Sequence, residues 1–142
     1  MNRMFTKASG ILLIALTLVL GGLYVPEKAA AAGTYVVTFQ SARLVSNSHV
    51  GSDWYTEGSV NGKNVREGSS VKVSSGNIKL YAYAEEQDKI PDIGKANKTI
   101  KTSSVSSSGT TVKIKVIVTE NRGRYSGHQA VWEFTYKIKS QK

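Results

Sequence analysis

Apolar and polar residues alternate with a period of two through most of this 142-residue chain, and beyond residue 32 no segment shows a convincing helical period. The alternation is clearest near the C-terminus, in residues 112–118 (VKIKVIV) and 132–138 (WEFTYKI). Side chains on a strand point alternately to its two faces, so these segments predict a β-hairpin with one buried face. We therefore predict an all-β fold, a single antiparallel β-sandwich of seven to eight strands, with a closed barrel as the alternative.

Turn-forming residues divide the rest of the chain into further short strands. The first strand has apolar residues at odd positions and changes parity at Ala42, which predicts a β-bulge near residues 40–41. Asn61-Gly62 has the chemistry of a two-residue type I′ turn, because both residues tolerate positive φ. Gly76-Asn77 is expected to join two more strands in the same way, and another strand is expected at residues 98–102.

The N-terminal segment, residues 1–32, has the pattern of a secretory signal peptide. Arg3 and Lys7 precede an apolar run, residues 10–25, that is short for a membrane span and leads to four consecutive alanines. We predict cleavage there, which leaves residues 33–142 as one secreted domain, extracellular or loosely associated with the wall. A retained anchor is the alternative. The absence of cysteine excludes a lipid-modified N-terminus of the bacterial lipoprotein kind.

The predicted secreted domain is strongly basic. The whole chain has 19 Lys and Arg and 10 Asp and Glu residues, of which three and one lie in the predicted signal peptide. The domain therefore has 16 basic and 9 acidic side chains and a net charge of +7. This excess favours contact with an anionic envelope polymer or lipid headgroups, with solubility as the alternative explanation. Nucleic acid is not expected as the physiological partner, and we expect a monomer.

Two predicted loops concentrate oxygen ligands. One ends in Asp53, and the other, residues 85–94, contains Glu86, Asp88 and Asp92. Calcium prefers six to eight hard oxygen ligands, and clustered carboxylates are costly to hold together unless a cation neutralises them. The spacing indicates a calcium site formed by these four carboxylates. A solvated polar turn is the alternative.

The same region resembles a known family. Residues 37–62, with Asp53-Trp54-Tyr55 leading to Val60-Asn61-Gly62, are similar to the first strand pair of C2-like sandwiches found in small secreted bacterial proteins of the Bacillus type. Residues 80–88 (LYAYAEEQD), followed by residues 91–94 (PDIG), are similar to the acidic third loop of C2 domains. The resemblance implies a C2-like fold and calcium-dependent surface binding. Because residues 47–49 (NSH) stand where calcium-binding members carry aspartates, we expect a metal-free C2-like sandwich without a cofactor, with a calcium-binding one as the alternative.

Eight outward-facing strand positions carry lysine or tyrosine. Their parity is opposite to that of the buried residues, so several are expected to share solvent-facing sheet surface. They are Lys72, Lys79, Tyr81, Tyr83, Lys113, Lys115, Lys137 and Lys139. Amines can neutralise a phosphate polymer while rings stack on its sugars or bases, so we predict polyanion binding by these residues. Protection of exposed strands against aggregation is the alternative role.

Motifs for catalysis are missing from the sequence. The chain has no cysteine nucleophile, no Gly-x-Ser-x-Gly elbow and no glycine-rich phosphate loop, and its two histidines, His49 and His128, fall in predicted loops. We therefore expect a secreted, non-enzymatic binding module that contacts the cell envelope or another anionic extracellular partner. The alternatives are a calcium-dependent surface-binding domain and a secreted effector, such as a toxin or inhibitor acting on competitors.

Overall fold

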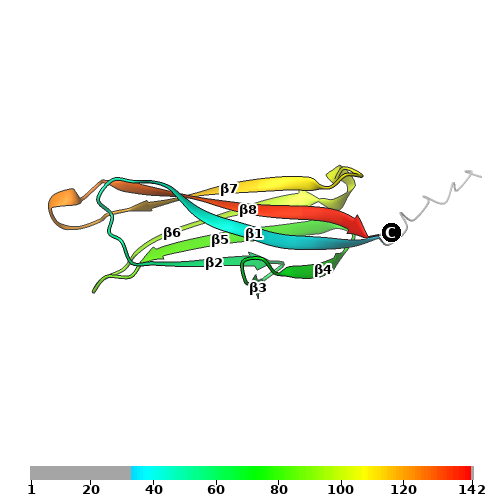
Figure 1. Ribbon diagram of the computed structural model, residues 1–142, viewed down its shortest axis with the longest axis horizontal. Coiled ribbons are helices and arrows are strands. Elements are labelled where there is room, and N and C mark those ends of the chain that lie inside the picture. The colour runs from blue at the N-terminus through cyan, green and yellow to red at the C-terminus, as the bar shows by residue number, and fades with distance from the viewer. Residues whose placement is uncertain (1–32, 142) are drawn as a thin grey trace, which may run out of the picture. The chain divides into compact units, whose positions relative to one another are not determined.

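A computed structural model describes residues 33–141 of this chain; the predicted signal peptide, residues 1–32, lies outside the described residues. The strands are β1 (Thr34–Asn47), β2 (Trp54–Val60), β3 (Lys63–Val65), β4 (Ser70–Ser74), β5 (Asn77–Glu86), β6 (Asp92–Lys101), β7 (Thr110–Thr119) and β8 (Gln129–Gln141), with two 3-10 turns, η1 (Thr102–Ser104) and η2 (Gly123–Tyr125). They form two antiparallel four-stranded sheets, ordered β4-β1-β8-β7 and β3-β2-β5-β6, that stack face to face (Figure 1). The prediction of an all-β antiparallel sandwich is confirmed. Within the described part of the chain, no helix is long and apolar enough to cross a membrane.

The core lies between the sheets and is built by the inward-facing side chains of both. Phe134, Tyr136 and Ile138 of β8 are fully buried. Phe39 of β1 stacks on Phe134 and on Tyr136, with ring centroids 5.7 and 5.0 Å apart. The hydroxyl of Tyr136 donates a hydrogen bond across the core to the carbonyl oxygen of Tyr81 in β5, at 2.5 Å. This bond joins the two sheets and satisfies a hydroxyl that would otherwise be buried without a partner.

The local irregularities expected from the sequence are present. The register between β1 and β8 shifts between Phe39 and Ser41, which confirms the bulge, and it shifts again between Leu44 and Ser46. Asn61-Gly62 joins β2 to β3 as a two-residue turn with positive φ at both residues. In the C-terminal hairpin, β7 pairs with β8 from Thr110 to Thr119, as the alternation of residues 112–118 and 132–138 predicts.

Two expectations about strands are corrected. Gly76 follows β4, but β4 and β5 do not form a hairpin, because β4 pairs with β1 in one sheet and β5 belongs to the other. The turn at this glycine therefore carries the chain from one layer to the next. The strand expected at residues 98–102 begins much earlier, at Asp92, so residues 85–94 are not one loop. Only residues 87–91 form the connection, and Glu86 and Asp92 belong to paired strands.

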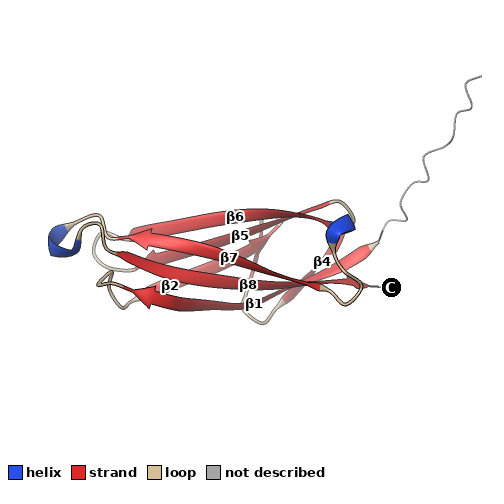
Figure 2. Cartoon of the chain, turned by 90° about the horizontal axis from the view of Figure 1, so that it is seen from above, coloured by secondary structure: helices blue, strands red, loops and turns tan. Residues whose placement is uncertain are grey.

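Three loops gather at one end of the sandwich, at the left of Figures 1 and 2. They are residues 48–53 between β1 and β2, residues 87–91 between β5 and β6, and residues 120–128 between β7 and β8. Backbone hydrogen bonds link them to their neighbours: the N–H of Ser48 donates to the carbonyl of Gln129 at 3.0 Å, and that of Gln87 donates to the carbonyl of Asp53 at 2.7 Å. We call this region the loop end.

Candidate functional site

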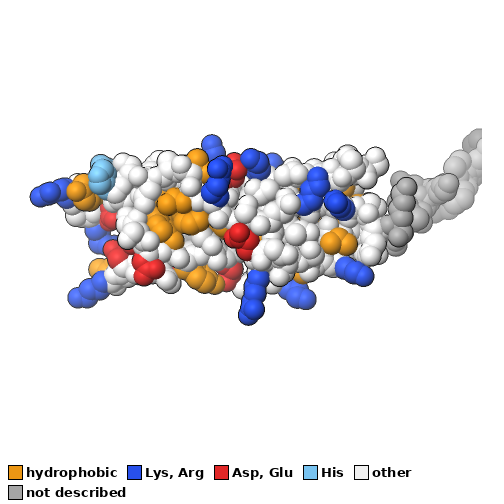
Figure 3. Space-filling view, viewed as in Figure 1, with side chains coloured by type: hydrophobic (Ala, Val, Ile, Leu, Met, Phe, Trp, Pro, Cys, Tyr) orange, Lys and Arg blue, Asp and Glu red, His pale blue; other side chains and the backbone are white. Residues whose placement is uncertain are grey.

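The outer face of the β4-β1-β8-β7 sheet is the most strongly charged surface that the strands build. Residues directly opposite each other in a sheet lie on the same face, and the strand pairings place six cationic side chains outward. They are Arg43, Lys72, Lys113, Lys115, Lys137 and Lys139, which we call the basic face. Figure 3 shows Lys and Arg side chains gathered over β8 and β1 on the upper side of the molecule. All four strands of the sheet contribute to this face, so it spans the full width of the sheet.

Glu133 of β8 is the one carboxylate at an outward strand position of this sheet within residues 33–141. Its Oε1 lies 2.9 Å from Nζ of Lys113 and 3.7 Å from a guanidinium nitrogen of Arg43. The hydrogen bond from Lys113 lowers the pKa of this carboxyl below its usual range. One anion is thus shared by two cations, while the other four residues of the basic face have no ion pair within the described chain.

The structure divides the set of residues predicted to bind a polyanion. Lys72, Lys113, Lys115, Lys137 and Lys139 lie together on the basic face. Lys79, Tyr81 and Tyr83 do not, because they belong to β5 in the opposite sheet. Parity distinguishes inward from outward positions but does not tell which sheet a strand joins. Arg43 was missed by sequence reasoning, although the predicted bulge places it at outward parity.

Two buried carboxylates lie at the loop end. Glu86 and Asp92 are cross-strand partners in β5 and β6, and both face the interior. They are 5 % and 1 % exposed, and Oε2 of Glu86 and Oδ2 of Asp92 are buried without a hydrogen-bond partner. Burial raises the pKa of Glu86, and the negative charge of Asp88 raises it further. Glu86 therefore takes up a proton more readily than an exposed glutamate.

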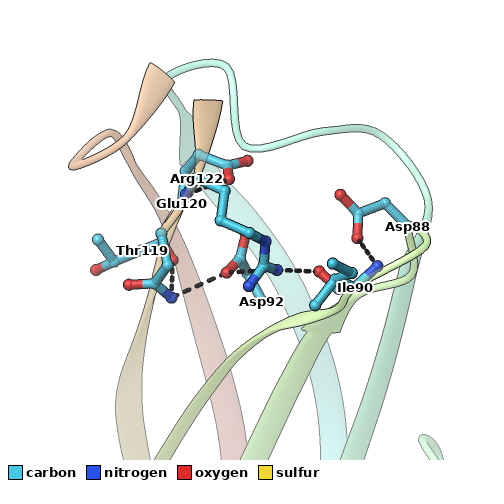
Figure 4. Close-up of polar contacts among 7 residues, drawn as sticks. Asp88, Ile90, Asp92, Thr119, Glu120 and Arg122 are labelled. Atoms are coloured by element: carbon cyan, nitrogen blue, oxygen red, sulfur yellow. Dashed lines mark hydrogen bonds and ion pairs between the residues drawn. The ribbon is translucent and has the colours of Figure 1, made fainter. Parts of the chain in front are cut away.

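Asp92 is the centre of a polar network between two loops (Figure 4). Its Oδ1 accepts a hydrogen bond from Nδ2 of Asn121 at 2.9 Å and lies 3.6 Å from the guanidinium of Arg122. The same guanidinium donates to the carbonyl oxygen of Ile90. The backbone N–H of Arg122 donates to the carboxylate of Glu120 at 3.0 Å. These contacts hold the β5–β6 and β7–β8 connections together.

The four carboxylates of the predicted calcium site do not converge. Among residues 33–141, no three Asp, Glu or His side chains lie close enough to share a metal ion. Asp53 and Asp88 are exposed on different loops, and Oδ1 of Asp88 accepts the backbone N–H of Ile90 at 2.7 Å. Asp92 already faces the guanidinium of Arg122. These four carboxylates are therefore not gathered into one site, and calcium-dependent binding stays a prediction.

The two histidines contribute to an aromatic cluster at the loop end. The ring of His49 stacks on that of Tyr125 with centroids 4.6 Å apart, and His128 lies 5.5 Å from both. Nδ1 of His128 lies 3.0 Å from the carbonyl oxygen of Ser48 and 3.2 Å from its Oγ. These contacts connect the β1–β2 and β7–β8 loops, which is a structural use of both rings.

No family model matches the chain, and no curated protein matches its sequence. The chemistry of its own surfaces is thus the basis for assigning a function.

Proposed function

We propose that this chain is a secreted, non-enzymatic binding module whose basic face contacts an anionic extracellular polymer, such as a phosphate-containing polymer of the cell envelope. The observation that carries the proposal is the charge of the outer face of the β4-β1-β8-β7 sheet, where the strands place six cations and one carboxylate. The signal-peptide pattern of residues 1–32 supports export, where such polymers are met.

The shape of the basic face suits an extended polymer. Lys72 comes from β4 and Lys137 and Lys139 from β8, with β1 between these strands, and Lys113 and Lys115 extend the same surface onto β7. Neighbouring strands are about 4.8 Å apart, so an extended polymer that crosses the sheet can contact several of these amines. Because each contact releases a condensed counterion, binding should weaken steeply as salt is added.

The test measures how the affinity for soluble inorganic polyphosphate depends on NaCl. Lys115 and Lys139 are replaced together by glutamine, because both are exposed and neither is held by Glu133 in an ion pair. By analogy with single-stranded nucleic acid, each lost contact should reduce the slope of log K against log salt by roughly 0.7, or about 1.4 for the pair. Fluorescence anisotropy of labelled polyphosphate gives the affinity.

A matched control separates the basic face from net charge. Replacing Lys79 and Lys101 by glutamine removes the same charge from exposed positions of the other sheet. We expect this variant to keep the slope of the unmodified protein. Equal losses in the two variants, or an affinity that does not depend on salt, would show that the basic face is not the binding surface.

A further inference from the structure

The outer face of the second sheet has a different chemistry near the loop end. A groove of about 440 Å³ runs over β2 and β5 there. It is lined by three tyrosines, two glutamates and one glutamine: Tyr55, Tyr81, Tyr83, Glu57, Glu85 and Gln87. We call it the tyrosine groove. Its residues lie on the sheet opposite to the basic face, so its ligand need not be the anionic polymer proposed above.

Tyrosine and glutamate alternate in the groove both along and across the strands. Tyr55 pairs with Glu85 across β2 and β5, and Glu57 pairs with Tyr83. The hydroxyl of Tyr55 donates to Oε2 of Glu57 at 2.8 Å, and the hydroxyl of Tyr83 donates to Oε2 of Glu85. The rings of the two tyrosines meet edge to face, with centroids 6.2 Å apart. The four side chains therefore hold one another in place.

The hydrogen bonds define what the groove offers to a ligand. The phenol protons of Tyr55 and Tyr83 are each committed to a carboxylate, and the hydrogen bond that Tyr83 donates to Glu85 raises the pKa of Tyr83 to about 12. The pKa of Tyr55 is raised in the same way by Glu57. Both hydroxyls therefore stay protonated at neutral pH. What these four side chains leave open to a ligand is a set of hydrogen-bond acceptors beside aromatic rings, of which Tyr55 is 43 % exposed.

We propose that the tyrosine groove binds an uncharged saccharide. A sugar ring supplies many hydroxyl donors for the acceptors of Glu57 and Glu85, and its C–H face covers an aromatic ring. The amide of Gln87 adds one more donor and acceptor group at the edge. A phosphate polymer does not suit this groove, because the carboxylates repel it. Tyr81 and Tyr83, predicted to stack on a polyanion, are thereby reassigned.

Charge also argues against an organic cation as the occupant. Lys95 of β6 pairs directly with Tyr83 and is exposed, so the neighbouring strand already carries a cation at the edge of the groove. A ligand ammonium would meet this lysine, whereas a neutral hydroxyl would not. The proposal goes beyond polyanion binding, since it concerns another surface and a ligand that needs no charge.

The test is isothermal titration calorimetry of the purified chain with three neutral probes: a soluble β-glucan, a soluble α-glucan and oligomers of N-acetylglucosamine. We expect at least one of them to bind, with an affinity that is the same in 0.05 and 0.5 M NaCl. Tyr55→Ala and Tyr83→Ala should each weaken that binding at least tenfold. Tyr125→Ala, which removes an exposed ring from the loop end instead, should leave it unchanged.

Two additional variants and two cationic probes distinguish loss of binding from loss of stability and a neutral ligand from a cationic one. If an alanine variant melts at a lower temperature, Glu57→Gln and Glu85→Gln retain the side-chain shape and should still weaken binding at least threefold. The inference is overturned if none of the three probes binds, or if Tyr125→Ala weakens binding as much as the groove variants. It is also overturned if only choline or a glucosamine polymer with free amines binds. Because Lys115 and Lys139 are untouched, none of these outcomes bears on the basic face.

Discussion

Glu133 offers a sharp test of the basic face, because removing it should strengthen binding to a polyanion. In the native protein its Oε1 is shared by Lys113 at 2.9 Å and Arg43 at 3.7 Å, so two of the six cations already have a counter-charge. Glu133→Gln releases both of them. No other outward strand position of this sheet within residues 33–141 carries a carboxylate, so the effect should be specific to this position.

The expected magnitude follows from counterion release. One additional phosphate contact steepens the slope of log K against log salt by roughly 0.7 to 0.9, which is about a five- to eightfold gain in affinity at 0.1 M relative to 1 M salt. If Arg43 and Lys113 are both freed, the gain is about 25- to 60-fold by the same relation. Lys113 is closer to the carboxylate than Arg43 is, so the release of Lys113 alone, which adds one phosphate contact, sets the lower limit of the expected gain in affinity.

The assay is the polyphosphate titration over a range of NaCl concentrations. Asp53→Asn serves as the control, since it removes one negative charge from an exposed position at the loop end. Because the pKa of Glu133 is lowered, its carboxylate stays ionised at mildly acidic pH, and the difference between variant and native protein should persist from pH 5 to pH 8. An unchanged slope in Glu133→Gln, or an equal gain in Asp53→Asn, would refute the reasoning.

Two further predictions concern stability. Glu86→Gln should raise the melting temperature at pH 7 and leave it unchanged near pH 3. A carboxyl whose folded-state pKa is raised stabilises the fold only while it is protonated, and this contribution is lost as the pH rises through the raised pKa. Thermal melts followed by circular dichroism at several pH values test this, and equal melting temperatures at pH 7 would contradict it. Tyr136→Phe should lower the free energy of unfolding by about 1 kcal/mol, because it removes the hydrogen bond to the carbonyl of Tyr81. That loss should lower the melting temperature by about 4 to 8 °C, and an unchanged value would show that the bond contributes nothing net.

Alternation in the sequence was sufficient to predict which side chains are buried, but not how the strands combine. The parity of residues 112–118 and 132–138 correctly separates the core from the surface. The change of layer after β4 could not be predicted, because Gly76 supports a tight hairpin and a crossing between sheets equally well. The basic face was therefore only partly anticipated, since its membership depends on which strands share a sheet.

The acids of the β5–β6 hairpin show a different limit. Residues 78–84 alternate with apolar side chains at even positions, and Glu86 continues this parity into the core. The charge of Glu86 indicated an exposed loop, whereas its place in the alternating pattern indicated a buried strand position. In the structure Glu86 is buried in β5. Asp92 likewise has the inward parity of Gly94. The partners that make its burial tolerable, Asn121 and Arg122, come from a distant connection that local sequence does not reveal.

The separation of the two outer surfaces has a physical consequence for binding. Two stacked sheets lie about 10 Å apart, and outward side chains add roughly 5 Å on each side, so charged groups on opposite faces are about 20 Å apart. This is about two and a half times the Debye length of roughly 8 Å at physiological salt, so the lysines of one face hardly affect the glutamates of the other. The core is formed by the inward positions of each strand, so the outward residues of the two sheets can differ in charge and ligand preference without affecting core packing. An anionic polymer on the basic face and a neutral saccharide in the tyrosine groove should therefore bind independently. Titrating the saccharide with polyphosphate already bound should give the same dissociation constant as titrating it alone.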